Sequence, residues 1–135
     1  LHVRVQRHCE NAAKIADFLA EQKQIERVVY PGRTDHPQHE IAKKQMTGGF
    51  GGMITAYFKG GLEPARTFLE RVKLFSLAES LGGVESLIEH PAIMTHASVD
   101  KHLREQIGLT DSLVRFSVGI EDVEDLISDI QEALG

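Results

Sequence analysis

Glycine clusters divide the middle of the chain and limit the length of any regular element between them. Residues 48–52 read Gly-Gly-Phe-Gly-Gly, and a glycine pair follows at positions 60 and 61. Residues 53–58, Met-Ile-Thr-Ala-Tyr-Phe, are rich in β-branched and aromatic side chains, so a short strand is predicted there. Glycine loops that bind phosphate lead into a helix. We therefore interpret the first cluster as a flexible or bulged strand entrance and not as an anion site.

Helical segments lie on both sides of this strand. Apolar residues recur at steps of three and four, which predicts a long helix from residue 5 to about 22–24, another over 62–72 and a closing helix over 123–134. Pro37 suits the first turn of a further helix, and residues 100–106 fit a short one.

Further strands are predicted over 25–30, 73–77 and 113–118. All are short, their turns are rich in glycine, and no dinucleotide-binding fingerprint is present. These features favour the α+β class, with a modest sheet covered on one face by helices.

Size and charge exclude several classes of protein. A chain of 135 residues fits one domain, and 20 acidic against 15 basic side chains leave no basic stripe for nucleic acid. No apolar run approaches the roughly 20 residues of a membrane span, so no membrane association is expected. The single cysteine, Cys9, cannot form an internal disulfide and fits a reduced, cytoplasmic setting. The seven histidines show no metal-ligand spacing.

The segment from residue 78 to 96 has a different composition from the rest of the chain. It places carboxylates, hydroxyls, a glycine pair and a proline within an otherwise apolar run. This is poor material for a core strand and typical of a loop that carries a polar site.

Three motifs occur in order along the second half of the chain. They are Ala-Glu-Ser-Leu-Gly-Gly-Val-Glu-Ser-Leu at 78–87, Pro-Ala-Ile-Met-Thr-His-Ala-Ser at 91–98 and Leu-Val-Arg-Phe-Ser-Val-Gly-Ile-Glu-Asp at 113–122. Together they resemble the C-terminal domain of the Cys/Met-metabolism enzymes that use pyridoxal phosphate (PLP), with cystathionine γ-lyase and γ-synthase as the nearest members. The resemblance covers essentially the whole chain.

This resemblance implies both a fold and a function. The expected fold is a small, mostly antiparallel sheet with helices on one side, preceded by a long helix. The expected function is part of a PLP-dependent carbon–sulfur lyase or transferase of transsulfuration, commonly a homotetramer, that acts on small amino-acid substrates.

Arg115 is the first candidate site residue. It lies within the predicted strand 113–118, on the face opposite Val114, Phe116 and Val118. Judged by its neighbours alone, an arginine on an open sheet face is more often solvated than functional. The alternative is a planar fork that binds a carboxylate through two parallel hydrogen bonds. The resemblance implies this alternative, because the matching arginine binds the substrate α-carboxylate.

Glu79, Ser80 and Thr95 complete the candidate set. On composition alone, Glu79 and Ser80 would be a solvated glutamate and a turn serine. The resemblance implies that Ser80 helps to bind the substrate carboxylate and that Glu79 faces the distal ammonium of cystathionine. Thr95 falls within the second motif as a possible neighbour of the site, and no specific role is assigned to it.

The resemblance also implies what these residues do not contain. The Schiff-base lysine, the partner of the ring nitrogen and the phosphate site are expected upstream, in a large PLP-binding domain of the same chain. Residues 1–24 are then the end of an interdomain linker helix, and residues 25–135 a substrate-recognition domain. The absence of a capping residue at Leu1 fits a piece cut from a longer polypeptide. We expect the 135 residues alone to be inactive.

Alternatives remain open at this point. The residues do not separate lyase from synthase, or cystathionine β-lyase and methionine γ-lyase from the γ-specific cystathionine enzymes. A non-catalytic module that binds an amino acid or mediates assembly is the rival of another class, because fold does not determine function. The trio Glu79, Ser80 and Arg115 distinguishes the enzyme from this rival.

Overall fold

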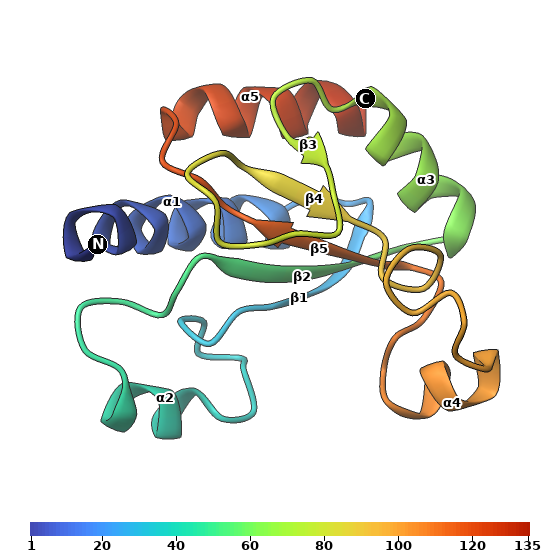
Figure 1. The fold of residues 1–135 in the computed structure, drawn as a ribbon, viewed down its shortest axis with the longest axis horizontal. Coiled ribbons are helices and arrows are strands. Elements are labelled where there is room, and N and C mark those ends of the chain that lie inside the picture. The colour runs from blue at the N-terminus through green and yellow to red at the C-terminus, as the bar shows by residue number, and fades with distance from the viewer.

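A computed structural model describes residues 1–135 as five helices and a five-stranded sheet (Figure 1). The elements are α1 (His2–Ala20), β1 (Ile25–Val29), α2 (His39–Gln45), β2 (Met53–Phe58), α3 (Leu62–Arg71), β3 (Ser76–Leu77), β4 (Leu87–Glu89), α4 (Lys101–Gln106), β5 (Leu113–Ser117) and α5 (Val123–Leu134). The strands lie in the order β1-β2-β5-β4-β3. All neighbouring pairs are antiparallel except β3 and β4, which are parallel. The predicted α+β class is confirmed, with a mixed sheet.

Helices α1, α3 and α5 cover one face of the sheet and form the core with it. The core cluster has 21 buried residues, among them Ile15 of α1 and Ile130 of α5. Phe68 of α3 lies with its ring centroid 5.0 Å from that of Phe58 in β2 and 6.0 Å from that of Phe116 in β5. Apolar contact across this layer is the main source of stability, since each buried aromatic side chain removes a large area from water.

The alternation predicted for strand 113–118 is present in β5. Val114 and Phe116 belong to the core cluster, whereas Arg115 between them does not. Arg115 therefore emerges on the sheet face that α1, α3 and α5 leave open. In Figure 1, α2 and α4 lie on the other side of the sheet from α5.

Two predicted helix boundaries are wrong. Helix α1 ends at Ala20 and not at 22–24, because Nε2 of Gln22 donates back to the carbonyl of Phe18 at 3.0 Å and the chain turns toward β1. Helix α2 begins at His39 and not beside Pro37. There the imidazole of His36 accepts the amide of Gln38 at 3.1 Å, which favours a turn over a first helical turn.

The predicted strand over 73–77 is shortened to Ser76–Leu77. The amides of Lys73, Leu74 and Phe75 donate to the carboxylate of Asp129 in α5 at 2.8, 2.9 and 3.3 Å. Backbone donors that point at one carboxylate cannot also form a strand ladder. A long-range contact, invisible in local sequence, decides the length of this strand.

The prediction of a loop across residues 78–96 is wrong in its centre. Leu87–Glu89 forms β4, which is buried throughout and lies between β3 and β5. The polar residue before it is structural: the Ser86 hydroxyl donates to Glu121 at 2.9 Å and accepts the amide of Gly119 at 2.8 Å. Glycine is required at position 119, since a Cβ there would clash with the carbonyl oxygen of Val84.

Cys9 and the glycine cluster both have defined places in the fold, and that of the cluster, a strand entrance, is the predicted one. Cys9 is buried on the inner face of α1, and its Sγ accepts the amide of Gly51 at 3.2 Å. The glycine cluster at 48–52 leads directly into β2. The chain has no helix that combines the length and apolar character needed to cross a bilayer.

Candidate functional site

Arg115 is the centre of the candidate site. It lies in the middle of β5, directly across from Glu89 of β4 and Thr55 of β2. Its Nη1 lies 3.1 Å from Oε1 of Glu89, and the two side chains are 23% and 1% exposed. The guanidinium therefore has one end on a buried carboxylate and another part within reach of solvent.

The loop after β3 contacts the same guanidinium through its backbone. Nη2 of Arg115 donates to the carbonyl oxygens of Glu79 at 3.2 Å and Ser80 at 3.4 Å. Both distances lie at or beyond the usual limit for such bonds, and both acceptors are neutral. These contacts are weaker than a charge-assisted bond to a carboxylate would be.

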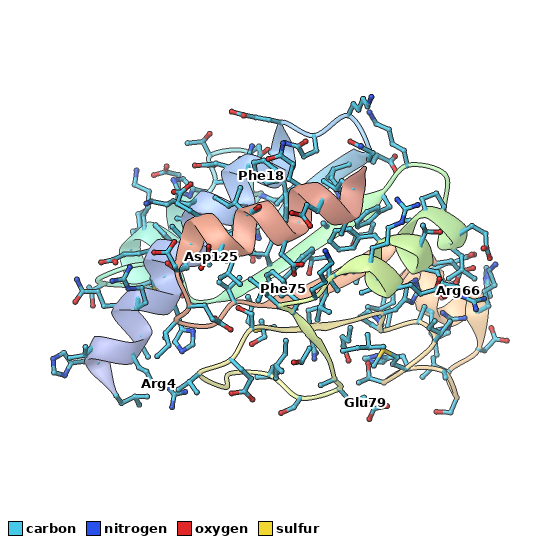
Figure 2. All side chains as sticks on the ribbon, turned by 90° about the horizontal axis from the view of Figure 1, so that it is seen from above. Arg4, Phe18, Arg66, Phe75, Glu79 and Asp125 are labelled. Atoms are coloured by element: carbon cyan, nitrogen blue, oxygen red, sulfur yellow. The ribbon has the colours of Figure 1, made fainter.

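Two contacts at Gly82 fix the position of this loop. Its amide donates to the hydroxyl of Ser117 in β5 at 2.8 Å, and its carbonyl accepts from Arg4 of α1 at 2.7 Å. In Figure 2, Phe75 lies between Asp125 of α5 and Glu79, so Glu79 is on the side away from α5. Arg115 and Ser117 alternate along β5 with core residues, so the contacts of the loop with them place it against the sheet face opposite the core.

The side chains of Glu79 and Ser80 are exposed, and neither forms a hydrogen bond or an ion pair within the chain. Their backbone contacts bring them to Arg115, while their functional groups remain free for a ligand. The structure therefore brings the predicted trio together in space, although the roles proposed for the side chains stay predictions.

Thr95 reaches the same cluster from the segment after β4. Its hydroxyl donates to Oε1 of Glu89 at 3.3 Å and lies 2.8 Å from Nδ1 of His96. Thr95 therefore contacts the carboxylate oxygen that also contacts Arg115, which places it beside the candidate site.

Glu89 was not identified from the sequence. It sits in a run with Leu87 and Ile88, and its second oxygen, Oε2, is buried with no hydrogen-bond partner. An acidic residue inside an apolar strand was the signal that could have revealed it, because isolated buried carboxylates are costly and rarely occur without a partner.

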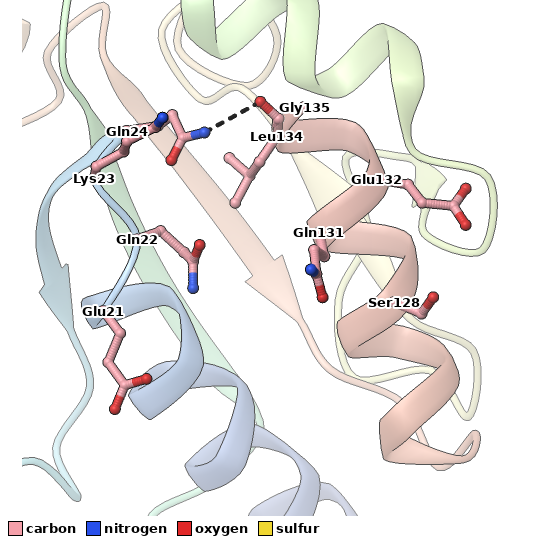
Figure 3. A pocket seen from close by; sticks show the side chains of 9 residues that line it. All are labelled: Glu21, Gln22, Lys23, Gln24, Ser128, Gln131, Glu132, Leu134 and Gly135. Carbon is pink, nitrogen blue, oxygen red and sulfur yellow. Dashed lines mark hydrogen bonds between the residues drawn. The ribbon is translucent and has the colours of Figure 1, made fainter.

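A groove away from this site lies between two helices. It measures about 700 Å³ between the end of α1 and the last turns of α5 (Figure 3). Its lining residues are Glu21, Gln22, Lys23, Gln24, Ser128, Gln131, Glu132, Leu134 and Gly135. None of them is buried, and Gln24 already donates to the carbonyl of Leu134 at 3.3 Å. The groove lacks the buried converging groups that a small-molecule site needs.

A metal site needs a cluster of ligating side chains, and a covalent PLP site needs a lysine. No cluster of three or more His, Cys, Asp or Glu side chains is placed to bind a metal ion. All seven lysines are exposed, at positions 14, 23, 43, 44, 59, 73 and 101. None of them lies in an enclosed pocket of the kind that lowers a lysine pKa for Schiff-base chemistry.

Comparison with known proteins identifies the family. A family model described as Cys/Met metabolism PLP-dependent enzyme matches residues 1–135. The chain belongs to this family. Its members depend on PLP, so the resemblance noted in the three motifs is confirmed.

Three relatives and one solved structure define the neighbourhood within the Cys/Met metabolism enzymes. A cystathionine gamma-lyase from Dictyostelium discoideum is 56% identical over 134 residues, covering 99% of this chain and 34% of the relative. A cystathionine beta-lyase from Coxiella burnetii is 55% identical over 134 residues, with the same shares. An L-methionine gamma-lyase from Fusobacterium nucleatum subsp. polymorphum is 54% identical over 132 residues, covering 98% and 33%. The crystal structure of metB from Corynebacterium glutamicum matches with a TM-score of 0.92 and 53% identity, over 98% of this chain and 34% of that one.

The chain spans about a third of the length of the curated relatives it matches. The relatives are lyases named for cystathionine or methionine, and the family is one of cysteine and methionine metabolism. PLP requires a Schiff-base lysine and a phosphate site. All seven lysines are exposed, and the glycine cluster at 48–52 leads into a strand, β2, and not into a helix N-terminus.

Proposed function

We propose that this chain is the C-terminal, substrate-recognition part of a PLP-dependent carbon–sulfur enzyme of transsulfuration, of the cystathionine γ-lyase or γ-synthase type. The observation that carries the proposal is the position of Arg115. A permanently charged, planar group lies partly exposed on the open face of the sheet, fixed from below by Glu89 and bordered by the loop of Glu79 and Ser80.

The role proposed for Arg115 is capture of the substrate α-carboxylate. Its contacts to two neutral carbonyls, at 3.2 and 3.4 Å, are the ones that an incoming carboxylate can replace. The exchange favours the substrate, because a charge-assisted, bidentate pair is shorter and stronger than a bond to an amide oxygen. Ser80, with its free hydroxyl, is proposed to add a donor to the same carboxylate.

The role proposed for Glu79 is selection at the far end of the substrate. Its side chain is exposed and has no partner within the chain, although its backbone lies against Arg115. A carboxylate opposite the distal ammonium of cystathionine adds a charge-assisted contact that methionine cannot make. Thr95 is proposed as a neighbour of the site that acts on Glu89.

The remaining parts of the enzyme are proposed to lie outside these residues. PLP, when bound, supplies an electron sink for the carbanion at the substrate α-carbon. We propose that a large upstream domain holds it, that residues 1–24 end the linker helix and that residues 25–135 position the substrate. The exposure of all seven lysines supports this division. A homotetramer is the proposed assembly of the complete enzyme.

The test is the change Arg115→Ala in the complete enzyme. We expect a sharply raised KM and a loss in kcat/KM of about 2 kcal/mol or more, as for a lost charge-assisted pair. Because this change also leaves the buried Glu89 without its counter-ion, Arg115→Lys is measured beside it, as it keeps the charge and removes the fork. A near-wild-type kcat/KM for cystathionine in both variants would contradict the assignment.

Measurements on the complete enzyme also test two alternative functions. Relatives of almost equal identity are a cystathionine beta-lyase and a methionine gamma-lyase, so product analysis with cystathionine and methionine decides the reaction. A non-catalytic assembly module would tolerate Arg115→Lys without any functional change, because this variant keeps the charge beside Glu89 and assembly does not need the planar fork.

A further inference from the structure

Glu89 is almost completely buried, which is rare for an acidic side chain. Its side chain is 1% exposed, Oε1 contacts Arg115 at 3.1 Å and Thr95 at 3.3 Å, and Oε2 is buried with no partner. An ionised carboxylate in this setting has lost most of its hydration, and two contacts on one oxygen replace only part of it.

The charged partner of Glu89 is Arg115. The two residues face each other in the register of β4 and β5, and Arg115 is the only ion-pair partner of Glu89. Replacement of a buried ion pair by apolar residues is often neutral or stabilising, so a contribution to stability does not by itself account for this pair. What the pair does supply is a fixed orientation of the guanidinium.

We propose that Glu89 is a positioning residue that aims Arg115 at the substrate carboxylate. This inference rests on the proposed function of Arg115. Oε1 fixes Nη1 from within the sheet, and the Thr95 hydroxyl fixes Oε1 in turn. Nη2 of Arg115, which does not contact Glu89, then faces the loop of Glu79 and Ser80, where a carboxylate can take the place of the two carbonyls. A preoriented fork loses less conformational entropy when the substrate binds.

The experiment is a double-mutant cycle in the complete enzyme. Glu89→Gln keeps the shape and removes the charge, and Arg115→Lys keeps the charge and removes the fork. We expect Glu89→Gln to raise KM for cystathionine roughly tenfold, with kcat changed less than about threefold, because the lost interaction acts on binding geometry. In the Arg115→Lys background the same change should alter KM by less than about twofold, since Glu89 acts through the fork.

Two further variants separate positioning from general damage. Asp111→Asn is the matched control, because Asp111 pairs with Arg104 at 3.5 Å and Lys101 at 2.8 Å, outside the site. It should leave KM unchanged. Glu89→Asp keeps the charge on a shorter arm and should recover part of the lost affinity, and it replaces Glu89→Gln in the cycle if that variant does not fold.

The possible results distinguish failure of the positioning role of Glu89 from failure of the proposed function of Arg115. Equal effects of the Glu89 change in both backgrounds, a loss confined to kcat, or no effect on KM would overturn the positioning role. If Arg115→Lys and Arg115→Ala both leave KM unchanged, the proposed function itself fails. A raised KM in the Arg115 variants with a normal KM in Glu89→Gln would reject only the inference about Glu89.

Discussion

Arg115 has two different kinds of acceptor around its guanidinium. On one side is a buried carboxylate at 3.1 Å, and on the other are two backbone carbonyls at 3.2 and 3.4 Å. The first contact is charge-assisted and shielded from water, whereas the other two are neutral and exposed. Under the proposed function, a ligand carboxylate would replace the second kind of acceptor and leave the first intact. At the scale of a single residue, Arg115 is both anchored and available.

Specificity is predicted to depend on Glu79. In the complete enzyme, Glu79→Val should lower the preference for cystathionine over methionine by roughly tenfold, because the distal ammonium loses its carboxylate partner. The measurement is the ratio of kcat/KM for the two substrates. Glu85→Val is a matched control, since Glu85 is exposed in the same loop and makes no contact with Arg115. An unchanged ratio in Glu79→Val would remove this residue from the site.

Strand β3 shows how one contact between elements shapes the sheet. Asp129 is 6% exposed within α5 and accepts the amides of residues 73, 74 and 75. Because these three amides are used by Asp129, β3 starts only at Ser76, and from there it pairs with β4 in the parallel direction. The loop of Glu79 and Ser80 follows directly, so its starting point depends on a residue of the last helix.

The stability of the chain should depend on this contact. Asp129→Ala is expected to lower the free energy of unfolding by about 2–4 kcal/mol, since it removes the acceptor for three amides in a largely buried place. Urea unfolding followed by circular dichroism measures the change. Asp125→Ala, at an exposed position of the same helix, should cost less than about 1 kcal/mol. A cost below about 1 kcal/mol for Asp129→Ala would mean that solvent replaces the carboxylate.

The whole molecule has two unequal sheet faces. Helices α1, α3 and α5 bury one of them in a core of 21 residues, while the other carries Arg115 and its neighbours. The chain is about a third as long as its relatives, and its lysines all lie in solvent. At this scale, the groups that we propose to recognise the substrate lie together on the open sheet face.

The 135 residues alone are therefore predicted to be inactive. Purified chain mixed with PLP and cystathionine should release no amine or thiol product, and the absorbance spectrum should show no specific Schiff base. The matched control is the complete enzyme with the same reagents. Saturable, stoichiometric formation of a Schiff base by the chain, lost on substitution of a single lysine, would contradict this division of labour.

Local sequence determined the elements whose stability is local or periodic. The stripes of α1, α3 and α5, the alternation around Arg115 and the glycine-bounded strand β2 were all predicted, because side-chain spacing fixes which face is buried. The three motifs determined the family, and with it the set Glu79, Ser80, Arg115 and Thr95.

Tertiary structure decided what depends on distant partners. The length of β3 follows from Asp129, more than fifty residues away. Strand β4 exists because β3 and β5 pair with its two edges, although its flanking sequence is polar. The pairing of Glu89 with Arg115 became visible only when β4 placed the two residues opposite each other, since no periodicity shows which residues face each other across two strands.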